Sequence, residues 1–178
     1  CLQFDGVNDY VDCGNDASLN ITSAITIEAW VKPLWNTSIN TDSFPVQKNG
    51  SYWIWCQWGT PRYAFEVWVD GARRNAGTFN VSAYNFHHLV GVYDSSDRTI
   101  RFYINGILKR SNTLSGLSKY TMNTSSNSVL IGQGAGGKSS LIDEVRIYNV
   151  ALPTAQIQQH YVQGLEKLLA NKAISPTE

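Results

Sequence analysis

Three tryptophans and one glutamate occupy alternate positions in two neighbouring aromatic segments. Trp53 and Trp55 are two residues apart, as are Glu66 and Trp68 further along the chain. Alternate side chains of an extended chain point to one face, so each pair lies on one side of its strand. Indole rings stack on the apolar faces of sugar rings, and a carboxylate accepts hydrogen bonds from sugar hydroxyls. The pattern predicts a carbohydrate-binding surface, and the competing interpretation is that these side chains are ordinary core.

A second group of residues supplies hard oxygen donors. Asp5, Asn8 and Asp9 lie in one turn-rich stretch near the N-terminus, and Asp143 lies in a polar strand near the C-terminus. Calcium takes about six to eight such oxygens. Short polar side chains also hydrogen-bond to nearby backbone. The alternative is therefore that Asp5 and Asn8 cap a turn and that Asp143 binds the backbone of the opposite strand.

The sequence contains no catalytic or phosphate-binding signature. Its glutamates are isolated from one another, at Glu28, Glu66, Glu144, Glu166 and Glu178. His87 and His88 are adjacent, so on a strand they point to opposite faces and cannot chelate one metal; we expect a structural His88 and an exposed His87. The Gly-rich residues 132–137 precede a strand rather than a helix and so do not match a phosphate loop. We expect a protein that is not an enzyme.

Composition narrows the class of partner. The 178 residues carry 14 basic and 14 acidic side chains, so nucleic acid and membrane surfaces are poor partners. No apolar run approaches the roughly 20 residues of a membrane span, and the first residues lack a signal-peptide pattern, so we expect any export signal to have been removed. Aromatic residues make up 12% of a chain with one Met. This profile favours a single β-rich domain, located outside the cell or at its surface.

The N-terminal segment 2–12 is predicted to form a hairpin. Cys1 and Cys13 flank it, so a cross-strand disulfide between them is compatible with the geometry. Two free thiols are the alternative. Cys56 lies between aromatic residues and is expected to be free and buried.

Hydrophobic periodicity predicts the remaining elements. Alternation indicates strands over 24–31, 52–56, 63–69, 86–93, 99–104 and 129–131, and a further strand that carries Asp143. Residues 32–49 are expected to form a surface loop, and Asn105-Gly106 a hairpin turn. From Pro153 the period becomes helical, with a break expected near Gly164. The chain is therefore predicted to be all-β, a two-sheet antiparallel β-sandwich with jelly-roll connections and one C-terminal α-helix.

Five stretches of the chain resemble the concanavalin A-like lectin/glucanase superfamily in its laminin-G-like branch. They are residues 2–11, 25–31, 86–94, 101–106 and 142–149, the last followed by Ala151-Leu152. Their order matches the family from residue 1 to about 163. The resemblance implies a laminin-G-like domain over 1–163, with residues 164–178 as a C-terminal helix extension and tail.

The resemblance also bears on the site. It implies that the first and last strands lie side by side, with one structural calcium ion held by Asp5, Asn8, Asp9 and Asp143. Glucanase members of the family carry a Glu-x-Asp-x-x-Glu strand, which is missing here.

Two hypotheses follow for the function. The first is a calcium-stabilised, non-catalytic module of an extracellular protein that binds a glycan or glycoprotein. The second is a structural or assembly domain of a surface filament, sheath or adhesin. In the second hypothesis the C-terminal helix contacts a neighbouring domain or subunit.

Overall fold

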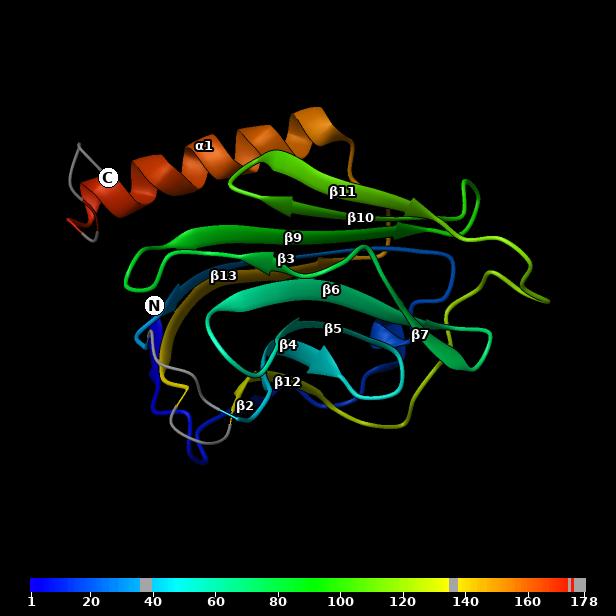
Figure 1. Cartoon of the computed structure of the whole chain (residues 1–178), viewed down its shortest axis with the longest axis horizontal. Helices are drawn as coiled ribbons and strands as arrows, with labels where there is room; N and C mark the ends of the chain where they lie inside the picture. The colour runs from blue at the N-terminus through cyan, green and yellow to red at the C-terminus, as the bar shows by residue number, and fades with distance from the viewer. Residues whose placement is uncertain (36–39, 135–137, 173, 175–178) are drawn as a thin grey trace.

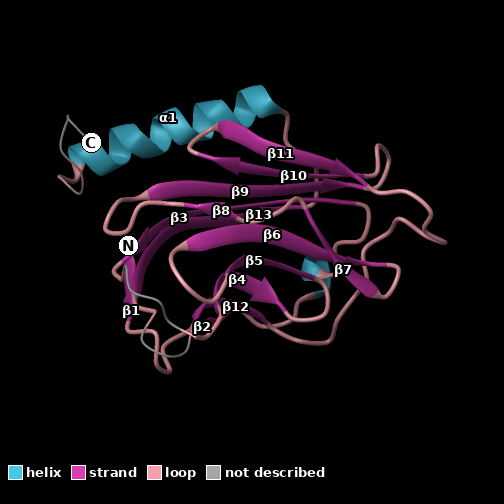
Figure 2. Cartoon of the chain, viewed as in Figure 1, coloured by secondary structure: helices cyan, strands magenta, loops and turns pink. Residues whose placement is uncertain are grey.

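The computed structural model describes residues 1–35, 40–134, 138–172 and 174. Two antiparallel sheets face each other, and one helix covers the outer face of the six-stranded sheet (Figures 1 and 2). The prediction of an all-β sandwich with one C-terminal α-helix is confirmed.

The strands divide between the two sheets in an interleaved order. The six-stranded sheet runs β1 (Leu2–Phe4), β13 (Ser140–Tyr148), β3 (Ala24–Pro33), β9 (His87–Asp94), β10 (Thr99–Ile104) and β11 (Ile107–Thr113). The second sheet runs β2 (Val11–Asp12), β12 (Val129–Gln133), β4 (Ser43–Lys48), β5 (Tyr52–Cys56), β6 (Arg62–Val69) and β7 (Ala72–Asn75), and β8 (Phe79–Asn80) pairs with β6. The helices are the 3-10 helix η1 (Ala17–Leu19) and α1 (Thr154–Ala170).

The N-terminal segment does not form the predicted hairpin. Strand β1 pairs with β13 and β2 pairs with β12, so the two strands lie in opposite sheets. The first and last strands are therefore side by side, as the family resemblance implies. Cys1 and Cys13 are exposed, free thiols, and the cross-strand geometry behind the predicted disulfide is absent. Cys56 is free and buried, as predicted.

Two predicted loops contain strand residues. Strand β4 lies inside the stretch 32–49, and it was not predicted because Pro45 is unusual within a strand. A register irregularity between Ser43 and Val46 accommodates this proline. Residues 36–39 of that stretch lie outside the described residues. Gly132 and Gln133 belong to β12 rather than to the Gly-rich segment 132–137. Residues 135–137 of that segment lie outside the described residues.

Strand β3 is buried on both faces. Its Ile25, Ile27, Ala29 and Val31 fill the space between the sheets, as the alternation predicts. Its outer residues Thr26, Glu28 and Trp30 are buried as well, because α1 lies over this sheet (Figure 1). Alternation of apolar and polar residues is typical of a half-buried strand, and that expectation is wrong here because α1 covers the outer face.

Helix α1 is continuous through Gly164, so the predicted break is wrong. Gly164 is buried against the Trp30 indole, and a Cβ added to it would lie 2.4 Å from the ring. The first half of the helix packs through Ile157 on a separate apolar cluster with Val90 and Tyr103. Helix α1 therefore belongs to the domain, a boundary at 163/164 would cut it, and its apolar face needs no neighbouring subunit for burial.

A buried carboxylate lies beneath the helix. Glu28 is fully buried, and its Oε1 accepts hydrogen bonds from Arg146 and Tyr148, each at 3.0 Å. His160 of α1 lies 3.1 Å from both carboxylate oxygens, and His88 Nε2 lies 3.3 Å from Oε2. Burial alone would raise the Glu28 pKa, but hydrogen bonds from His88, Arg146 and His160 outweigh it and lower the pKa to about 2.

A bulge in β13 explains its polar sequence. The register with β3 shifts between Asp143 and Arg146, where Glu144 has a φ of 49°. The shift lets Ile142 face the core on one side of the bulge, while Val145 and Ile147 pack against the core on the other side. It also places Arg146 directly opposite Glu28.

We predict that Gly164→Ala destabilises the protein, although alanine is normally the better helix former by about 1 kcal/mol. The added methyl group would overlap the Trp30 ring, and such overpacking costs roughly 1–3 kcal/mol. Urea unfolding measures the change, with the exposed neighbour Gln163→Ala as control. An increase in stability for Gly164→Ala would contradict the close packing of α1 on β3.

We predict that Glu28→Gln weakens the protein at neutral pH and flattens its acid response. The depressed pKa of Glu28 gives stability that is present above the ordinary value of 4.5 and is lost as pH falls toward about 2. The shift corresponds to about 3 kcal/mol. Urea unfolding at pH 7, 4.5 and 2.5 measures it, with exposed Glu166→Gln as the matched control. Parallel pH curves for wild type and Glu28→Gln would contradict the network.

Candidate functional site

A row of side chains crosses the outer face of the second sheet. The strand registers place the following residues opposite one another in sequence across β12, β4, β5, β6 and β7: Leu130, Gln47, Trp53, Glu66 and Asn75. Their neighbours along each strand, such as Val46, Ile54 and Val67, point inward to the core. The predicted strand alternation thus delivers Trp53 and Glu66 to one face.

Glu66 holds Trp53 in place. The Trp53 Nε1–H donates a hydrogen bond to Glu66 Oε2 at 2.9 Å, and the Asn75 amide donates to Oε1 at 2.7 Å. Arg73 lies 4.0 Å from the same carboxylate. Glu66 is only 4% exposed, so both oxygens are engaged within the protein. Its described partners are an indole, an amide and a guanidinium rather than a second carboxylate.

Aromatic rings surround Trp53. Its ring centroid lies 4.2 Å from that of Trp68 in a T-shaped arrangement and 5.1 Å from that of Phe44. The Arg73 guanidinium lies 6.0 Å from the centroids of both indoles. Trp53 is only 6% exposed, whereas Trp68 and Phe44 are partly exposed. Trp53 is therefore the base of the cluster, and its neighbours offer the accessible surface.

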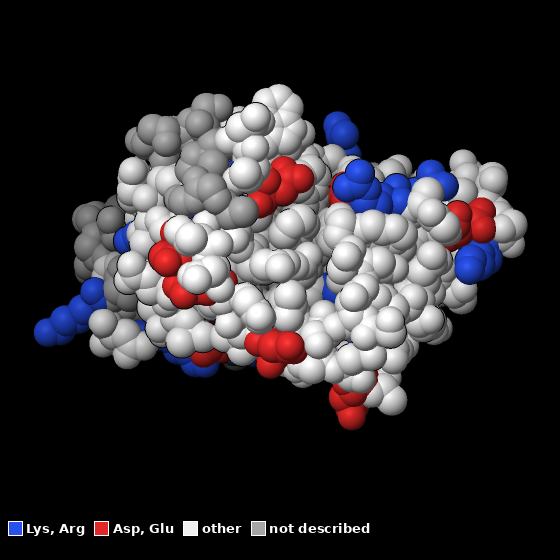
Figure 3. Space-filling view, turned by 90° about the horizontal axis from the view of Figure 1, so that it is seen from below, with Lys and Arg blue, Asp and Glu red and all other residues white. Residues whose placement is uncertain are grey.

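A groove of about 480 Å³ runs beside the cluster. Trp53 and Phe44 form part of its wall, and the other lining residues are mainly amides and hydroxyls: Gln47, Asn49, Asn127, Ser128, Leu130 and Gln133. Figure 3 shows the molecule from below, and on this side uncharged residues predominate while charged ones form small separate groups. The groove combines flat apolar rings with neutral hydrogen-bonding groups.

The predicted set of Trp53, Trp55, Glu66 and Trp68 is brought together only in part. Trp53, Glu66 and Trp68 form one contact cluster. Trp55 lies two residues beyond Trp53 on β5, where it pairs with Ala64. It is therefore on the opposite side of the row from Trp68. The sequence did not predict the groove residues Phe44 and Gln47, because they lie in β4, within a stretch that was expected to be a loop.

The predicted calcium ligands do not converge. In the β1–β13 register Leu2 lies opposite Ile142, so Asp143 sits beside Cys1, whose ammonium group is 3.3 Å from its carboxylate. Asp143 Oδ1 also accepts a hydrogen bond from Glu144 N–H. Asp5 lies at the opposite end of β1, four residues and thus about 13 Å away. The expected reach of Asp143 to Asp5 is therefore wrong.

The N-terminal turn keeps the other three oxygen donors together. Asp5 Oδ1 accepts a hydrogen bond from Val7 N–H at 2.7 Å, and Asp9 Oδ2 accepts one from Asp5 N–H at 3.0 Å. The Asp5 contact is the turn cap that the alternative interpretation predicts, and the second contact comes from Asp9 rather than from Asn8. Asn8 is exposed beside them. Calcium binding by this turn stays a prediction from the sequence.

The histidine pair is buried on both sides of β9. His88 is 1% exposed and faces Glu28, in agreement with a structural role. His87 is 8% exposed, so the prediction of an exposed His87 is wrong. The loop that precedes β9 covers it, since the Ser82 carbonyl oxygen lies 2.9 Å from its Nε2.

Comparison with known families agrees with the fold. The family model described as the concanavalin A-like lectin/glucanases superfamily, of laminin G type, matches residues 5–158. The chain belongs to this superfamily. Comparison with curated proteins finds no match. Within the described residues no helix is long and apolar enough to cross a membrane.

The solved structures that resemble the chain include clostridial toxin binding domains. The binding domain of Paraclostridial mosquitocidal protein 1 superposes with a TM-score of 0.73 at 14% identity, over 91% of this chain and 43% of that one. The binding domain of botulinum neurotoxin serotype G gives 0.71 at 18% identity, over 91% and 42%. The serotype D ligand-binding domain, in complex with N-acetylneuraminic acid, gives 0.71 at 12% identity, over 90% and 41%. This chain spans less than half the length of each, and identities this low demonstrate the fold alone.

We predict that calcium raises the melting temperature of chelator-treated protein if the N-terminal turn binds it, and that Asp9→Asn abolishes the rise. Ligand at 100 times its dissociation constant stabilises a protein by about 2.7 kcal/mol. Asp143→Asn is the control, since Asp143 of β13 lies beside Cys1, at the end of β1 remote from the turn, and its replacement should leave the calcium response intact. An unchanged melting temperature in wild-type protein would remove calcium from the description of this domain.

Proposed function

We propose that this domain is a non-catalytic carbohydrate-binding module of an extracellular protein and that its glycan lies in the groove beside Trp53, Trp68 and Phe44. The observation that carries the proposal is the row of side chains across the outer face of the second sheet. It joins an aromatic cluster to a 480 Å³ groove lined by amides. The volume lies within the range of small-ligand sites, about 300–1,000 Å³.

The chemistry of the groove suits a neutral or weakly polar sugar chain. Phe44 in the groove wall is partly exposed, as is Trp68, which contacts Trp53 but lies outside the groove lining; both offer ring surfaces to the C–H faces of sugars. Gln47 and Gln133 supply both donors and acceptors for hydroxyl groups. Glu66 acts indirectly, because its two oxygens position Trp53 and Asn75. A site that binds with rings and amides requires no reacting carboxylate.

The comparisons support glycan binding at a coarse level. The superfamily is described by its lectins and glucanases. One similar toxin domain was solved with N-acetylneuraminic acid, and a second is described through its interaction with two ganglioside molecules. The ganglioside interaction is described for cell entry, so that toxin meets its target cell from outside, which supports the proposed extracellular location.

We predict that Trp68→Ala weakens polysaccharide binding at least tenfold, which corresponds to about 1.4 kcal/mol of lost stacking. A glycan array first identifies a bound polysaccharide, and isothermal titration then compares the variants. Trp58→Ala is the matched control, because Trp58 is the most exposed tryptophan of those described, at 59%, and belongs neither to the groove lining nor to the ring contacts around Trp53. Its affinity should stay within twofold of wild type.

Several outcomes would refute this assignment. A blank array together with no change in tryptophan fluorescence on titration would remove the carbohydrate proposal. Equal losses in the two variants would indicate a different surface, which includes the loop between β5 and β6. Sedimentation of wild-type protein at increasing concentration tests the competing assembly role, for which association should grow with concentration.

A further inference from the structure

The chain contains two Asn-Gly pairs, and the fold gives them different surroundings. Asn49-Gly50 lies in the turn between β4 and β5, and Asn105-Gly106 forms the turn between β10 and β11. A glycine nitrogen has no Cβ beside it to hinder its approach, so it can attack the asparagine side-chain carbonyl and close a cyclic imide. Each pair is therefore a candidate for modification, and its surroundings decide whether it reacts.

Asn49 is accessible in the turn between β4 and β5. Its side chain is exposed and lines the groove, and within the described residues its amide has no hydrogen-bond partner. The Ser51 N–H closes the turn on the Lys48 carbonyl at 3.0 Å, and Gly50 supplies the positive φ, 83°, that a type II turn requires. The Gly50 N–H donates none of the backbone hydrogen bonds of the described turns and loops. Both reacting groups are consequently free of competing contacts.

Two donors point at the carbonyl oxygen of the Asn49–Gly50 peptide group. The Ser125 hydroxyl donates to this oxygen at 2.5 Å, and the Asn127 side-chain amide donates to it at 3.0 Å. Asn127 also donates to the Ser125 hydroxyl oxygen from its backbone and from its side chain, which strengthens that hydroxyl as a donor. Lys48 Nζ holds the same loop by donating to the Asn127 carbonyl at 2.7 Å. The two donors are thus fixed in place before any reaction.

These donors favour the reactive form of the Gly50 nitrogen. When that nitrogen loses its proton, the negative charge is shared with the carbonyl oxygen of the same peptide group. Donors that already point at an oxygen on which charge develops stabilise the transition state, as in an oxyanion hole. The turn between β4 and β5 therefore combines an attacking nitrogen, the carbonyl that it attacks and fixed donors that promote the attack.

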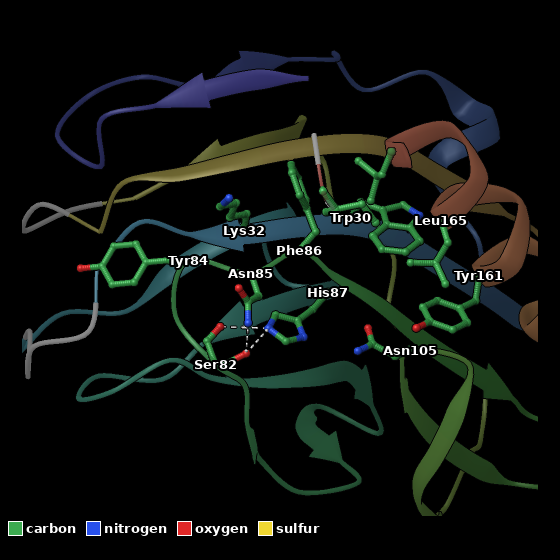
Figure 4. Close-up of a pocket in the computed structure, with 12 residues that line it drawn as sticks. Trp30, Lys32, Ser82, Tyr84, Asn85, Phe86, His87, Asn105, Tyr161 and Leu165 are labelled. Atoms are coloured by element: carbon green, nitrogen blue, oxygen red, sulfur yellow. Dashed lines mark hydrogen bonds between the residues drawn. The ribbon is translucent and has the colours of Figure 1, made fainter. Parts of the chain in front are cut away.

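The second pair is protected. Asn105 Oδ1 accepts the His88 N–H at 2.9 Å, and the Asn105 N–H donates to the His88 carbonyl at 2.8 Å. Gly106 is buried, and a Cβ added to it would lie 3.2 Å from the Tyr161 ring. Figure 4 shows Asn105 beside Tyr161 in the wall of a cavity of about 200 Å³, beneath α1. Rotation of the Asn105 side chain toward the Gly106 nitrogen would break its hydrogen bond with His88.

We propose that Asn49 is a site of deamidation promoted by the fold, and that its product makes the neutral groove acidic. The Gly50 nitrogen bonds to the Asn49 Cγ, the Cγ–Nδ2 bond breaks, and the proton of the attacking nitrogen leaves with the amide group as ammonia. Water then opens the cyclic imide at either carbonyl and leaves an aspartate or an isoaspartate. The formal net charge changes from 0 to −1, because a neutral amide becomes a carboxylate. That carboxylate enters a groove whose described lining has no charged side chain.

The effect on binding rests on the proposed function. A carboxylate cannot donate the hydrogen bonds that the Asn49 amide offers to sugar hydroxyls. Asn49→Asp copies one product and should weaken the polysaccharide identified by the array about fivefold, the effect of one ordinary hydrogen bond. Unchanged affinity would overturn the link between deamidation and the groove. A blank array would refute the glycan assignment alone, since deamidation rates are measured without a ligand.

Peptide mapping by mass spectrometry tests the proposal on the intact chain, incubated in mildly alkaline buffer with water as the only added reactant. We expect folded protein to convert Asn49 about tenfold or more faster than Asn105. In guanidinium-unfolded protein the two rates should agree within a few-fold, because unfolding removes the contacts that distinguish the pairs. Ser125→Ala should slow Asn49 about fivefold in folded protein and leave the unfolded rate unchanged. Exposed Ser115→Ala is the matched control.

Asn127→Asp provides a second variant, in case Ser125→Ala loosens the turn. It replaces the donating amide by a carboxylate of nearly the same shape, so it should slow the conversion of Asn49 by a similar factor. The proposal is overturned if folded protein converts Asn49 no faster than Asn105, or if both variants convert Asn49 as fast as wild type does.

Discussion

The buried Glu28 carboxylate is the constraint on which the rest of this domain depends. An isolated charge in a protein interior costs several kcal/mol, so Glu28 is tolerable only with its partners in place. Those partners come from elements far apart in sequence: His88 from β9, Arg146 and Tyr148 from β13, and His160 from α1. Arg146 reaches it because β13 contains a bulge. The helix, the bulge and the central strands therefore have to assemble as one unit.

Each sheet carries a buried glutamate among aromatic residues on its outer face, but the two faces differ in what covers them. On each outer face a nearly inaccessible glutamate lies among aromatic rings, Glu28 near Trp30 and Glu66 against Trp53. In the six-stranded sheet a helix covers the glutamate and its neighbours. In the second sheet no described helix covers the row, and Arg73, with 59% of its side chain exposed, lies over the indoles instead. The first face is consequently closed except for one cavity, while the second keeps an open groove.

Local patterns were sufficient for the family and for the long strands β3, β5, β6, β9, β10 and β13. The alternation of residues 24–31 identified the core face of β3, and Asn105-Gly106 identified a turn that the structure confirms with positive φ at both residues. The pairing partners of the strands were harder to predict. Nothing in residues 2–12 distinguishes a hairpin from two strands that belong to opposite sheets. The burial of Glu28 and of His87 was not predicted either. Glu28 is covered by α1, which is distant in sequence, and His87 is covered by the loop that precedes β9.

The candidate site shows the same division. Period-two spacing correctly placed Trp53 with Glu66 and Trp68, because strand alternation is a local property. Gln47 and Phe44 were hidden by Pro45 in a stretch that reads as loop. Asp143 was grouped with the N-terminal donors because the first and last strands were expected to be neighbours. That neighbourhood is real, but the antiparallel register sends Asp143 to the opposite end of β1 from Asp5.

Helix α1 extends the packed structure beyond the residues that match the family. The family match ends at residue 158, inside the helix. A polypeptide emerging from the ribosome with only the matched residues exposed would present Trp30 and Glu28 without His160, Gly164 or Leu168 to cover them. The last turns of α1 therefore complete the cover over β3, although they lie beyond the residues that match the family.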